Sequence, residues 1–277
     1  MKDFPVSLPR TAAERVRLRW PFRVARHEHL PGVIWTLVRT DFKVRYHGTA
    51  MGFLWALLKP LAMLLVLVSV FSFVFASHPH YALNLVVALF IWDFFAEGTK
   101  VGLTSLHAKA YLLTKTRFPR WIVVVASLSN VAVTLAVTAI GMTVVVLVAG
   151  RPVTAAGLAW FAAYLVQLAM IVVGISLAGS VLFLRYRDLN QVWEVVIGAG
   201  FFAAPVIYPL DILPERFHAY LFLWPPTPVI QFARAVLVDG VIPSPRAHAL
   251  LALATIAALA AGIVVFRRHA PGIAERL

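Results

Sequence analysis

The sequence contains a long stretch, residues 121–149, in which no side chain carries a charge. A helix needs about 20 consecutive apolar residues to cross the roughly 30 Å of hydrocarbon in a bilayer, and this stretch exceeds that length. The rest of the chain agrees, because 61% of its 277 residues are hydrophobic and 13% are charged, against about 45–50% and about 25% in ordinary globular domains. A soluble particle of this size cannot hide so much apolar surface, so the sequence predicts a membrane protein.

Five more apolar stretches bring the expected number of transmembrane helices to six. They cover residues 52–76, 81–105, 157–184, 191–208 and 247–266. The stretch that starts at residue 81 is interrupted by Asp93, Glu97 and Lys100. The one that starts at residue 191 is rich in glycine and is stopped by Pro205 and Pro209, so this helix is expected to break near its end. The predicted fold class is all-α, a polytopic membrane protein.

The basic residues lie mostly on one side of this predicted bundle. Most of the 25 lysines and arginines fall in residues 1–59, 100–120, 185–187 and 267–276. Because Lys and Arg concentrate in cytoplasmic loops, both termini are predicted to lie in the cytoplasm. The formal charge of +13 then reflects these loops and anionic membrane lipid rather than nucleic acid. No N-terminal signal peptide is expected, because the first apolar stretch begins about fifty residues into the chain.

Residue patterns that carry covalent chemistry are scarce. The chain has no cysteine, which excludes disulfides, thiol catalysis and thiolate metal sites. No glycine is followed by lysine, so there is no P-loop to hold a nucleotide. Asp93 and Glu97 allow two interpretations: a cation or proton site inside the membrane, or a pair that binds Lys100 or lines a wet interior. The second interpretation is preferred, and no enzyme activity, metal or cofactor is expected in this chain.

The chain divides into a cytoplasmic N-terminal segment, residues 1–50, and a six-helix domain, residues 51–277. Residues 27–50 can form an amphipathic helix with an apolar stripe made of Leu30, Val33, Ile34, Leu37 and Val38. A second stripe carries Arg39, Lys43 and Tyr46. Asp41 and Arg45, one turn apart, can form an ion pair. Such a helix would lie in the membrane interface, either as a plain anchor or as an element that binds lipid headgroups.

Several short motifs follow one another in an order that resembles a known family. Residues 40–46 read TDFKVRY, and residues 48–60 read GTAMGFLWALLKP. Further along come WDFF at 92–95, RFPR at 117–120, RYRD at 185–188, PVIYP at 205–209 and LPER at 213–216. Together they resemble the permease subunits of type-2 ABC exporters that move polysaccharides, O-antigens and teichoic acids. One departure is visible, because residues 224–228 read WPPTP where the family often has Asn-Pro.

The resemblance implies roles for one cytoplasmic segment and one outer segment. Residues 106–120 would contain the coupling helix that docks in the ATPase subunit, through Leu112, Leu113, Lys115, Arg117 and Phe118. An apolar anchor with cations around its rim suits such a contact, and the alternative is a solvated basic loop. Residues 210–228 would form short helices that re-enter the outer leaflet before the last span.

The resemblance also places aromatic side chains on the path of the cargo. Candidates for lining the channel are Phe71, Phe75, Trp193, Phe201 and Tyr208. The apolar C–H faces of sugars can slide over such rings, because these contacts are weak and do not trap the polymer. The alternative is ordinary packing or lipid contact, which is preferred for Phe73 because it lies on the opposite face from Phe71.

The resulting functional hypothesis is a half-channel subunit in the inner or plasma membrane. Two copies would form a homodimeric conduit, and two separate ATP-binding cassette subunits would supply ATP hydrolysis with Mg²⁺. The cargo would be a lipid-linked polysaccharide whose (pyro)phosphate is attracted by Arg39, Lys43 and Arg45. The alternatives are an exporter of a small hydrophobic or drug-like substrate and, less favoured, a membrane-embedded transferase for lipid-linked sugars that would use Asp93 and Glu97.

Overall fold

The computed structural model describes residues 30–46, 52, 54–115 and 119–270 of the chain. Among these residues every regular element is a helix and no strand occurs, which confirms the predicted all-α class. In chain order the elements are α1 (Leu30–Tyr46), α2 (Leu54–Val74), α3 (Tyr81–Ala108), α4 (Ala110–Lys115), α5 (Trp121–Val148), α6 (Ala155–Arg185), α7 (Leu189–Ala203), η3 (Leu210–Ile212), α8 (Glu215–Phe222), α9 (Pro226–Arg234), η4 (Ala235–Asp239) and α10 (Pro245–His269).

Five of the described helices are long and apolar enough to cross a membrane. They are α2, α3, α5, α6 and α10. The chain bends by 115° between α8 and the α9–η4 pair, and a sixth crossing results if these segments count as one broken span. The predicted fifth span, residues 191–208, corresponds to α7, which is not among these five helices. Helix α7 has 15 residues, and a rise of 1.5 Å per residue makes it only about 22 Å long. The protein is a multi-pass membrane protein.

Proline ends α7 earlier than the apolar stretch suggested. The helix stops at Ala203, and Ala204 takes an extended conformation with φ −77° and ψ 130°. The residue before a proline is pushed out of the helical region by the proline ring, and Pro205 has no N–H with which to continue the helix. The prediction that this helix breaks near its end is therefore correct, and the break comes before residue 205.

Local sequence signals set several other helix ends. Thr154 caps α6, with its Oγ1 accepting a hydrogen bond from the Gly157 N–H at 3.0 Å. Ser244 caps α10 in the same way, followed by Pro245 in the first turn, where no N–H is needed. After α5 the chain turns at Gly150, whose φ of +72° is in the left-handed region that favours glycine.

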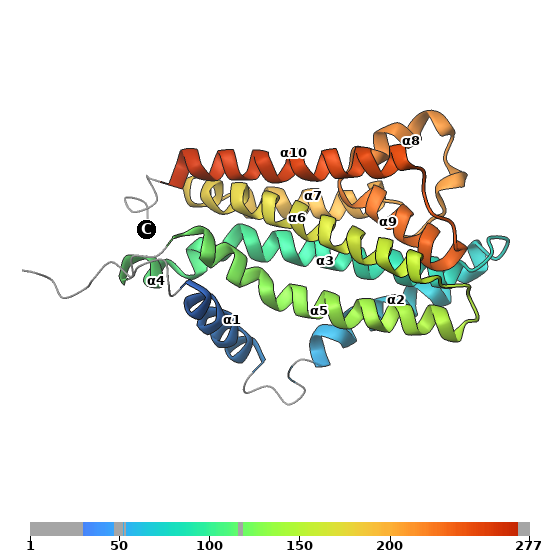
Figure 1. Ribbon diagram of the computed structural model, residues 1–277, viewed down its shortest axis with the longest axis horizontal. Coiled ribbons are helices and arrows are strands. Elements are labelled where there is room, and N and C mark those ends of the chain that lie inside the picture. The colour runs from blue at the N-terminus through green and yellow to red at the C-terminus, as the bar shows by residue number, and fades with distance from the viewer. Residues whose placement is uncertain (1–29, 47–51, 53, 116–118, 271–277) are drawn as a thin grey trace, which may run out of the picture.

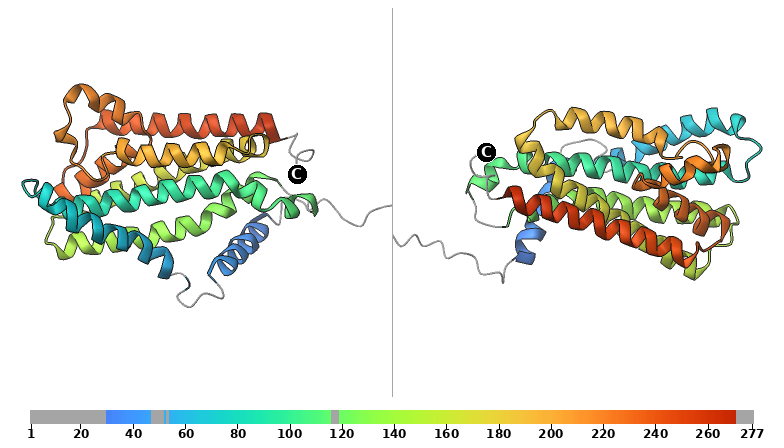
Figure 2. Two further views of the ribbon diagram at one scale, coloured as in Figure 1. Left: turned by 180° about the vertical axis from the view of Figure 1, so that it is seen from behind. Right: turned by 90° about the horizontal axis from the view of Figure 1, so that it is seen from above.

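The bundle has two distinct ends. One end carries α1, α4 and the last turns of α6 and α10, and we call it the basic end because Arg185, Arg267 and Arg268 lie in those last turns (Figure 1). The other, the distal end, carries the α2–α3 and α5–α6 turns together with α8 and α9 (Figures 1 and 2). This division matches the sidedness expected from the lysine and arginine distribution. The assignment of the basic end to the cytoplasm stays a prediction.

Helix α3 lies at the centre of the bundle although it carries charged residues. In the 18-residue apolar stretch of α3 that could cross a membrane, 61% of the residues are buried, against 11% in the corresponding stretch of α2. It packs against α5, α6, α2 and α9, and its side chains form much of the main hydrophobic core. A polar helix at the centre is favoured because its ionisable groups can face a protein cavity instead of lipid.

Two glycines let α6 and α10 approach very closely along the bundle. A Cβ added to Gly174 would lie 2.6 Å from the Ala258 carbonyl oxygen, and a Cβ added to Gly262 would overlap the Gly174 carbonyl. Small residues at such crossings replace the hydrophobic effect, which is weak between helices in lipid, with close backbone packing. Figure 1 shows the two helices side by side.

We expect Gly262→Ala to lower the stability of the detergent-solubilised protein by about 1–3 kcal/mol, because the added methyl group overpacks this contact. Thermal unfolding followed by size-exclusion chromatography measures the change. Gly141→Ala in α5 is the matched control, since a Cβ there meets no atom within 4 Å. Alanine should leave that site unchanged or stabilise it by up to about 1 kcal/mol. Equal stability of the two variants would contradict the close packing.

Candidate functional site

A cavity of about 600 Å³ lies between α2, α3, α5 and α7. Apolar side chains such as Phe90, Phe94 and Leu135 form much of its wall. Two of its charged residues come from the parts of the helices nearer the basic end: Lys100 is in the last third of α3, and Glu194 is in the first half of α7. We call this space the main cavity. Its volume is in the range of ligand-binding pockets.

Five charged side chains line the main cavity: Lys59, Asp93, Glu97, Lys100 and Glu194. Lys100 Nζ lies 2.6 Å from Glu194 Oε1, which joins α3 to α7. Both side chains are about half exposed, so this pair contributes little stability, at most about 1 kcal/mol. The preferred interpretation of Asp93 and Glu97, that they line a polar interior, agrees with their position. Sequence reasoning missed Glu194 as the partner of Lys100 because α7 is almost a hundred residues away along the chain.

Trp193 is the predicted channel aromatic that lines the main cavity. Its indole Nε1–H donates to Thr99 Oγ1 at 3.0 Å, and the Thr99 hydroxyl donates to the Phe95 carbonyl at 2.8 Å. These bonds fix the indole against α3 while part of the ring stays accessible. The arrangement provides an aromatic surface beside carboxylate and ammonium groups.

The other predicted channel aromatics lie elsewhere in the single chain. Phe71 and Phe75 stack on one another with ring centroids 6.1 Å apart. Phe201 packs edge-on against the buried Trp92 at 5.6 Å. Tyr208 lines a second cavity, at the distal end. The described residues therefore do not place the five aromatics around one cavity, and their role as a channel lining stays a prediction. Phe73 is 84% exposed, in agreement with the lipid contact expected for it.

A buried arginine holds the chain where α7 breaks. Arg234 is 7% exposed. It donates from Nη1 to the Pro205 carbonyl and from Nη2 to the Val206 carbonyl, both at 2.8 Å. Its Nε donates to the Asn84 carbonyl of α3 at 2.9 Å. Backbone groups outside a helix must find partners inside the protein when water is excluded, and this side chain supplies them.

Two tyrosines complete the support of the PVIYP segment. The Tyr81 hydroxyl, from the first residue of α3, donates to the Ile207 carbonyl at 2.6 Å. The Tyr208 hydroxyl turns back and donates to the Phe202 carbonyl in α7 at 2.8 Å. The carbonyls of three successive residues after the break are thus bonded to α3 or α9. Sequence reasoning singled out the motif but not Arg234, because an arginine that binds backbone carbonyls leaves no pattern in the sequence.

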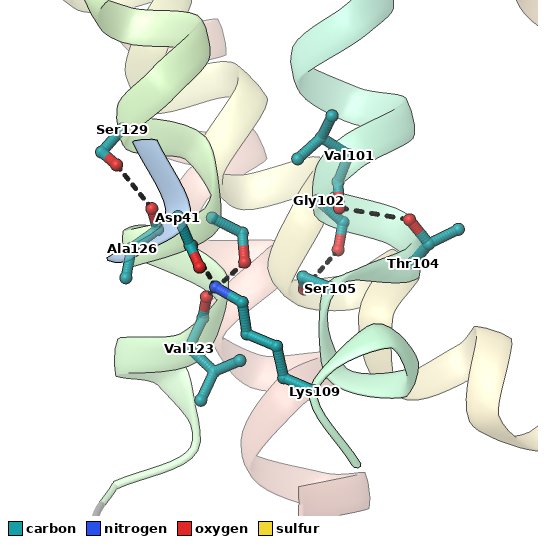
Figure 3. A network of polar contacts seen from close by, with 10 residues as sticks. Asp41, Val101, Gly102, Thr104, Ser105, Lys109, Val123, Ala126 and Ser129 are labelled. Carbon is teal, nitrogen blue, oxygen red and sulfur yellow. Dashed lines mark hydrogen bonds and ion pairs between the residues drawn. The ribbon is translucent and has the colours of Figure 1, made fainter. Parts of the chain in front are cut away.

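At the basic end an ion pair connects α1 to the predicted coupling segment. Lys109 stands between α3 and α4, and its Nζ contacts the Asp41 carboxylate of α1 (Figure 3). Both side chains are largely buried, at 17% and 20% exposure. At the other end of the segment, the Arg120 guanidinium donates to the Ala270 carbonyl that follows α10. Contacts to α1 and to the end of α10 therefore flank the segment that contains α4.

The remaining predicted residues of the basic end divide into two groups. A helix, α1, is present where the interfacial helix was expected, with Arg39 and Lys43 exposed on it; its place at a membrane surface stays a prediction. Leu112 and Leu113 are half-buried in α4, and Leu113 packs against the core at this end. The side chains of Arg45 and Lys115, together with residues 117 and 118 (Arg117 and Phe118), lie outside the described residues.

The short helices predicted within residues 210–228 are present as η3 and α8, followed by α9 and η4, which continue to Asp239. Between α8 and the α9–η4 pair the chain bends by 115°. Among the described residues no group of three or more His, Asp and Glu side chains is arranged to hold a metal ion.

The architecture fits the comparison with known proteins, in which residues 32–238 match the ABC-2 type transporter family. The chain belongs to the ABC-2 type transporter family. It is 27% identical over 74% of its length to an O-antigen export system permease protein RfbA of Klebsiella pneumoniae, covering 80% of that protein. The RfbA of Myxococcus xanthus is 26% identical over 89% of this chain and 95% of its own. The polysialic acid transport protein KpsM of Escherichia coli is 22% identical over 82% of this chain and 89% of its own.

Membership confirms the resemblance drawn from the short motifs and places them in this ABC-2 bundle. WDFF lies in the centre of α3, and RYRD forms the turn between α6 and α7. PVIYP is the supported break after α7, and LPER opens α8. The motifs thus mark the charged helix and the points where the chain turns or breaks.

We expect Arg234→Met to destabilise the protein by about 2 kcal/mol or more, because the buried Pro205 and Val206 carbonyls lose their donor and each costs about 1–3 kcal/mol. The thermal unfolding midpoint of the solubilised protein measures the loss. Arg246→Met is the matched control, since Arg246 is exposed in the first turn of α10. If both variants unfold like the wild type, Arg234 does not support the break.

Proposed function

We propose that this chain is the membrane subunit of an ATP-driven exporter that moves a lipid-linked polysaccharide from the cytoplasm across the inner membrane. The supporting observation is that relatives named for O-antigen export and polysialic acid transport align with 74–89% of this chain and 80–95% of their own lengths. A similarity that runs through most of the chain, rather than one motif, favours a shared cargo class.

Membership of the ABC-2 family implies an ABC ATPase as partner. We place ATP and Mg²⁺ in that partner, because this sequence contains no Gly-Lys pair for a P-loop. Two copies of the ATPase would bind a homodimer of this chain at residues 106–120. The half-buried Leu112 and Leu113 of α4 and the basic residues around them suit a groove with a polar rim.

The cargo would enter from the basic end, which we assign to the cytoplasm by the positive-inside rule. Arg39 and Lys43 are exposed on α1, and together with Arg45 they would attract the (pyro)phosphate of the lipid carrier. The sugar part would then meet the main cavity, where the fixed indole of Trp193 offers an apolar surface beside polar groups. Weak repeated contacts of this kind let a long polymer slide.

The experiment is reconstitution of the chain with its ATPase partner in proteoliposomes loaded with a lipid-linked polysaccharide. We expect ATP-dependent movement of the glycan, and ATPase activity that rises when the lipid-linked glycan is added. Arg39→Gln combined with Lys43→Gln should reduce this stimulation several-fold, because the double variant removes two exposed cations that attract the headgroup.

Arg267→Gln combined with Arg268→Gln is the matched control, because these arginines also lie at the basic end but on α10. Unchanged export and stimulation in the α1 variant would remove the headgroup role. Stimulation by a small hydrophobic compound and not by the glycan would favour the drug-like cargo, and sugar transfer without any ATPase would favour the transferase.

The Asp41–Lys109 pair gives a further prediction about coupling. A headgroup bound on α1 can influence the ATPase contact only through a connection between the two, and this ion pair is one. We expect Lys109→Asp to reduce glycan-stimulated ATPase activity several-fold, because it leaves two carboxylates facing one another in a largely buried position. Basal ATPase activity should be retained.

The combined variant Asp41→Lys and Lys109→Asp restores the pair with reversed charges. It should recover most of the stimulation, measured as the ratio of ATPase rates with and without glycan. Asp188→Lys, an exposed carboxylate at the start of α7, controls for the added charge. A reversed pair that is no better than Lys109→Asp alone would show that the connection lies elsewhere.

A further inference from the structure

A second cavity, of about 340 Å³, lies at the distal end. We call it the distal cavity. It forms where the α2–α3 turn, the first turn of α3, the segment after α7 and the α9–η4 pair meet. The polar side chains that line it are His78, Tyr81, Asn84, Tyr208, Asp211, Gln231, Arg234 and Asp239. None of these residues belongs to the charged group of the main cavity.

The chemistry of the distal cavity fits a ligand that both donates and accepts hydrogen bonds. The carboxylates of Asp211 and Asp239 accept, while the amides of Asn84 and Gln231 can do both. The two carboxylates outnumber the one guanidinium of the lining, Arg234, which disfavours an anion such as phosphate. Three of the five N–H groups of Arg234 are used on backbone carbonyls. Neutral hydroxyl groups are the partners that match this mixture.

One polar atom of the wall is left without a partner. Gln231 Nε2 is buried and makes no hydrogen bond within the protein. A buried amide donor without an acceptor is costly, so such groups in native proteins call for a specific explanation. Because Gln231 lines the distal cavity, a turn of its side chain would bring this donor to an oxygen acceptor of a ligand there.

One aromatic wall of the distal cavity has a fixed orientation. His78 Nε2 lies 3.2 Å from Asp211 Oδ2, but the Asp211 side chain is 72% exposed, so this contact stabilises the cavity little. Tyr208 is fixed through its hydroxyl to the Phe202 carbonyl, so its ring is presented in one orientation. A ring of fixed orientation beside planar amide and carboxylate groups suits a sugar, whose hydroxyls lie at the edge and whose C–H groups lie on the face.

We propose that the distal cavity binds a sugar unit of the exported glycan after it has passed the bundle. The proposal rests on the polysaccharide cargo and on the assignment of the distal end to the outer side. The volume is at the lower limit of ligand pockets, which suits one or two sugar units and not a longer chain. A sugar held there would oppose backward sliding of the polymer between transport steps.

The test is saturation-transfer NMR on the full chain with its ATPase partner in nanodiscs, without ATP. The probes are the free methyl glycosides of glucose, galactose, mannose and N-acetylglucosamine. We expect at least one glycoside to receive saturation, and Gln231→Leu and Asp239→Asn each to reduce that signal at least fivefold. Asp188→Asn, an exposed carboxylate at the basic end, is the control and should keep the signal.

Thermal unfolding of each variant shows whether it is folded, and the exposed Asp239 makes Asp239→Asn the milder change. The proposal is overturned if no glycoside gives a signal with the wild type, or if both distal variants keep it. It is also overturned if Trp193→Ala removes the signal and the distal variants do not, because the sugar then binds in the main cavity. Failure of glycan export in proteoliposomes would instead count against the proposed function, since the NMR measurement requires no transport.

Discussion

The structure depends on the bonds that Arg234 makes to the backbone where α7 ends. A membrane protein can interrupt a helix only if the freed carbonyl groups find partners within the protein. Arg234 supplies two of these partners and Tyr81 a third, so three carbonyls in a row are satisfied from α9 and α3. The same guanidinium also holds α3 through the Asn84 carbonyl. One buried cation therefore fixes how three elements meet.

This break lies between the main cavity and the distal cavity. On the side of the basic end, α7 contributes Trp193 and Glu194 to the main cavity. Beyond the break, Tyr208 and Asp211 line the distal cavity. The sequence did not predict that α7 ends as early as Ala203. Because it does, the residues that follow are free of the helix and can line the distal cavity. The charged central helix α3 reaches both cavities, through Asp93 at one and Asn84 at the other.

Much of the architecture could be predicted because it depends on local patterns. The uncharged stretch at residues 121–149 became α5, Trp121–Val148, nearly as expected. The ordered motifs indicated the correct family. The partners of Lys100, Lys109 and Arg234 could not be predicted, because the groups they bind lie on other helices and repeat at no fixed spacing.

The sequence by itself determined that this chain is a membrane protein. It also determined which residues form the long helices and at which helix ends the basic residues lie, because hydropathy and charge act on each segment separately. Only the tertiary structure decided which ionisable groups form pairs, which side chains bond the backbone after α7 and which cavities remain between the helices. Those features arise from distances between segments far apart in the chain. A pattern along one helix carries no information about them until the helices have packed.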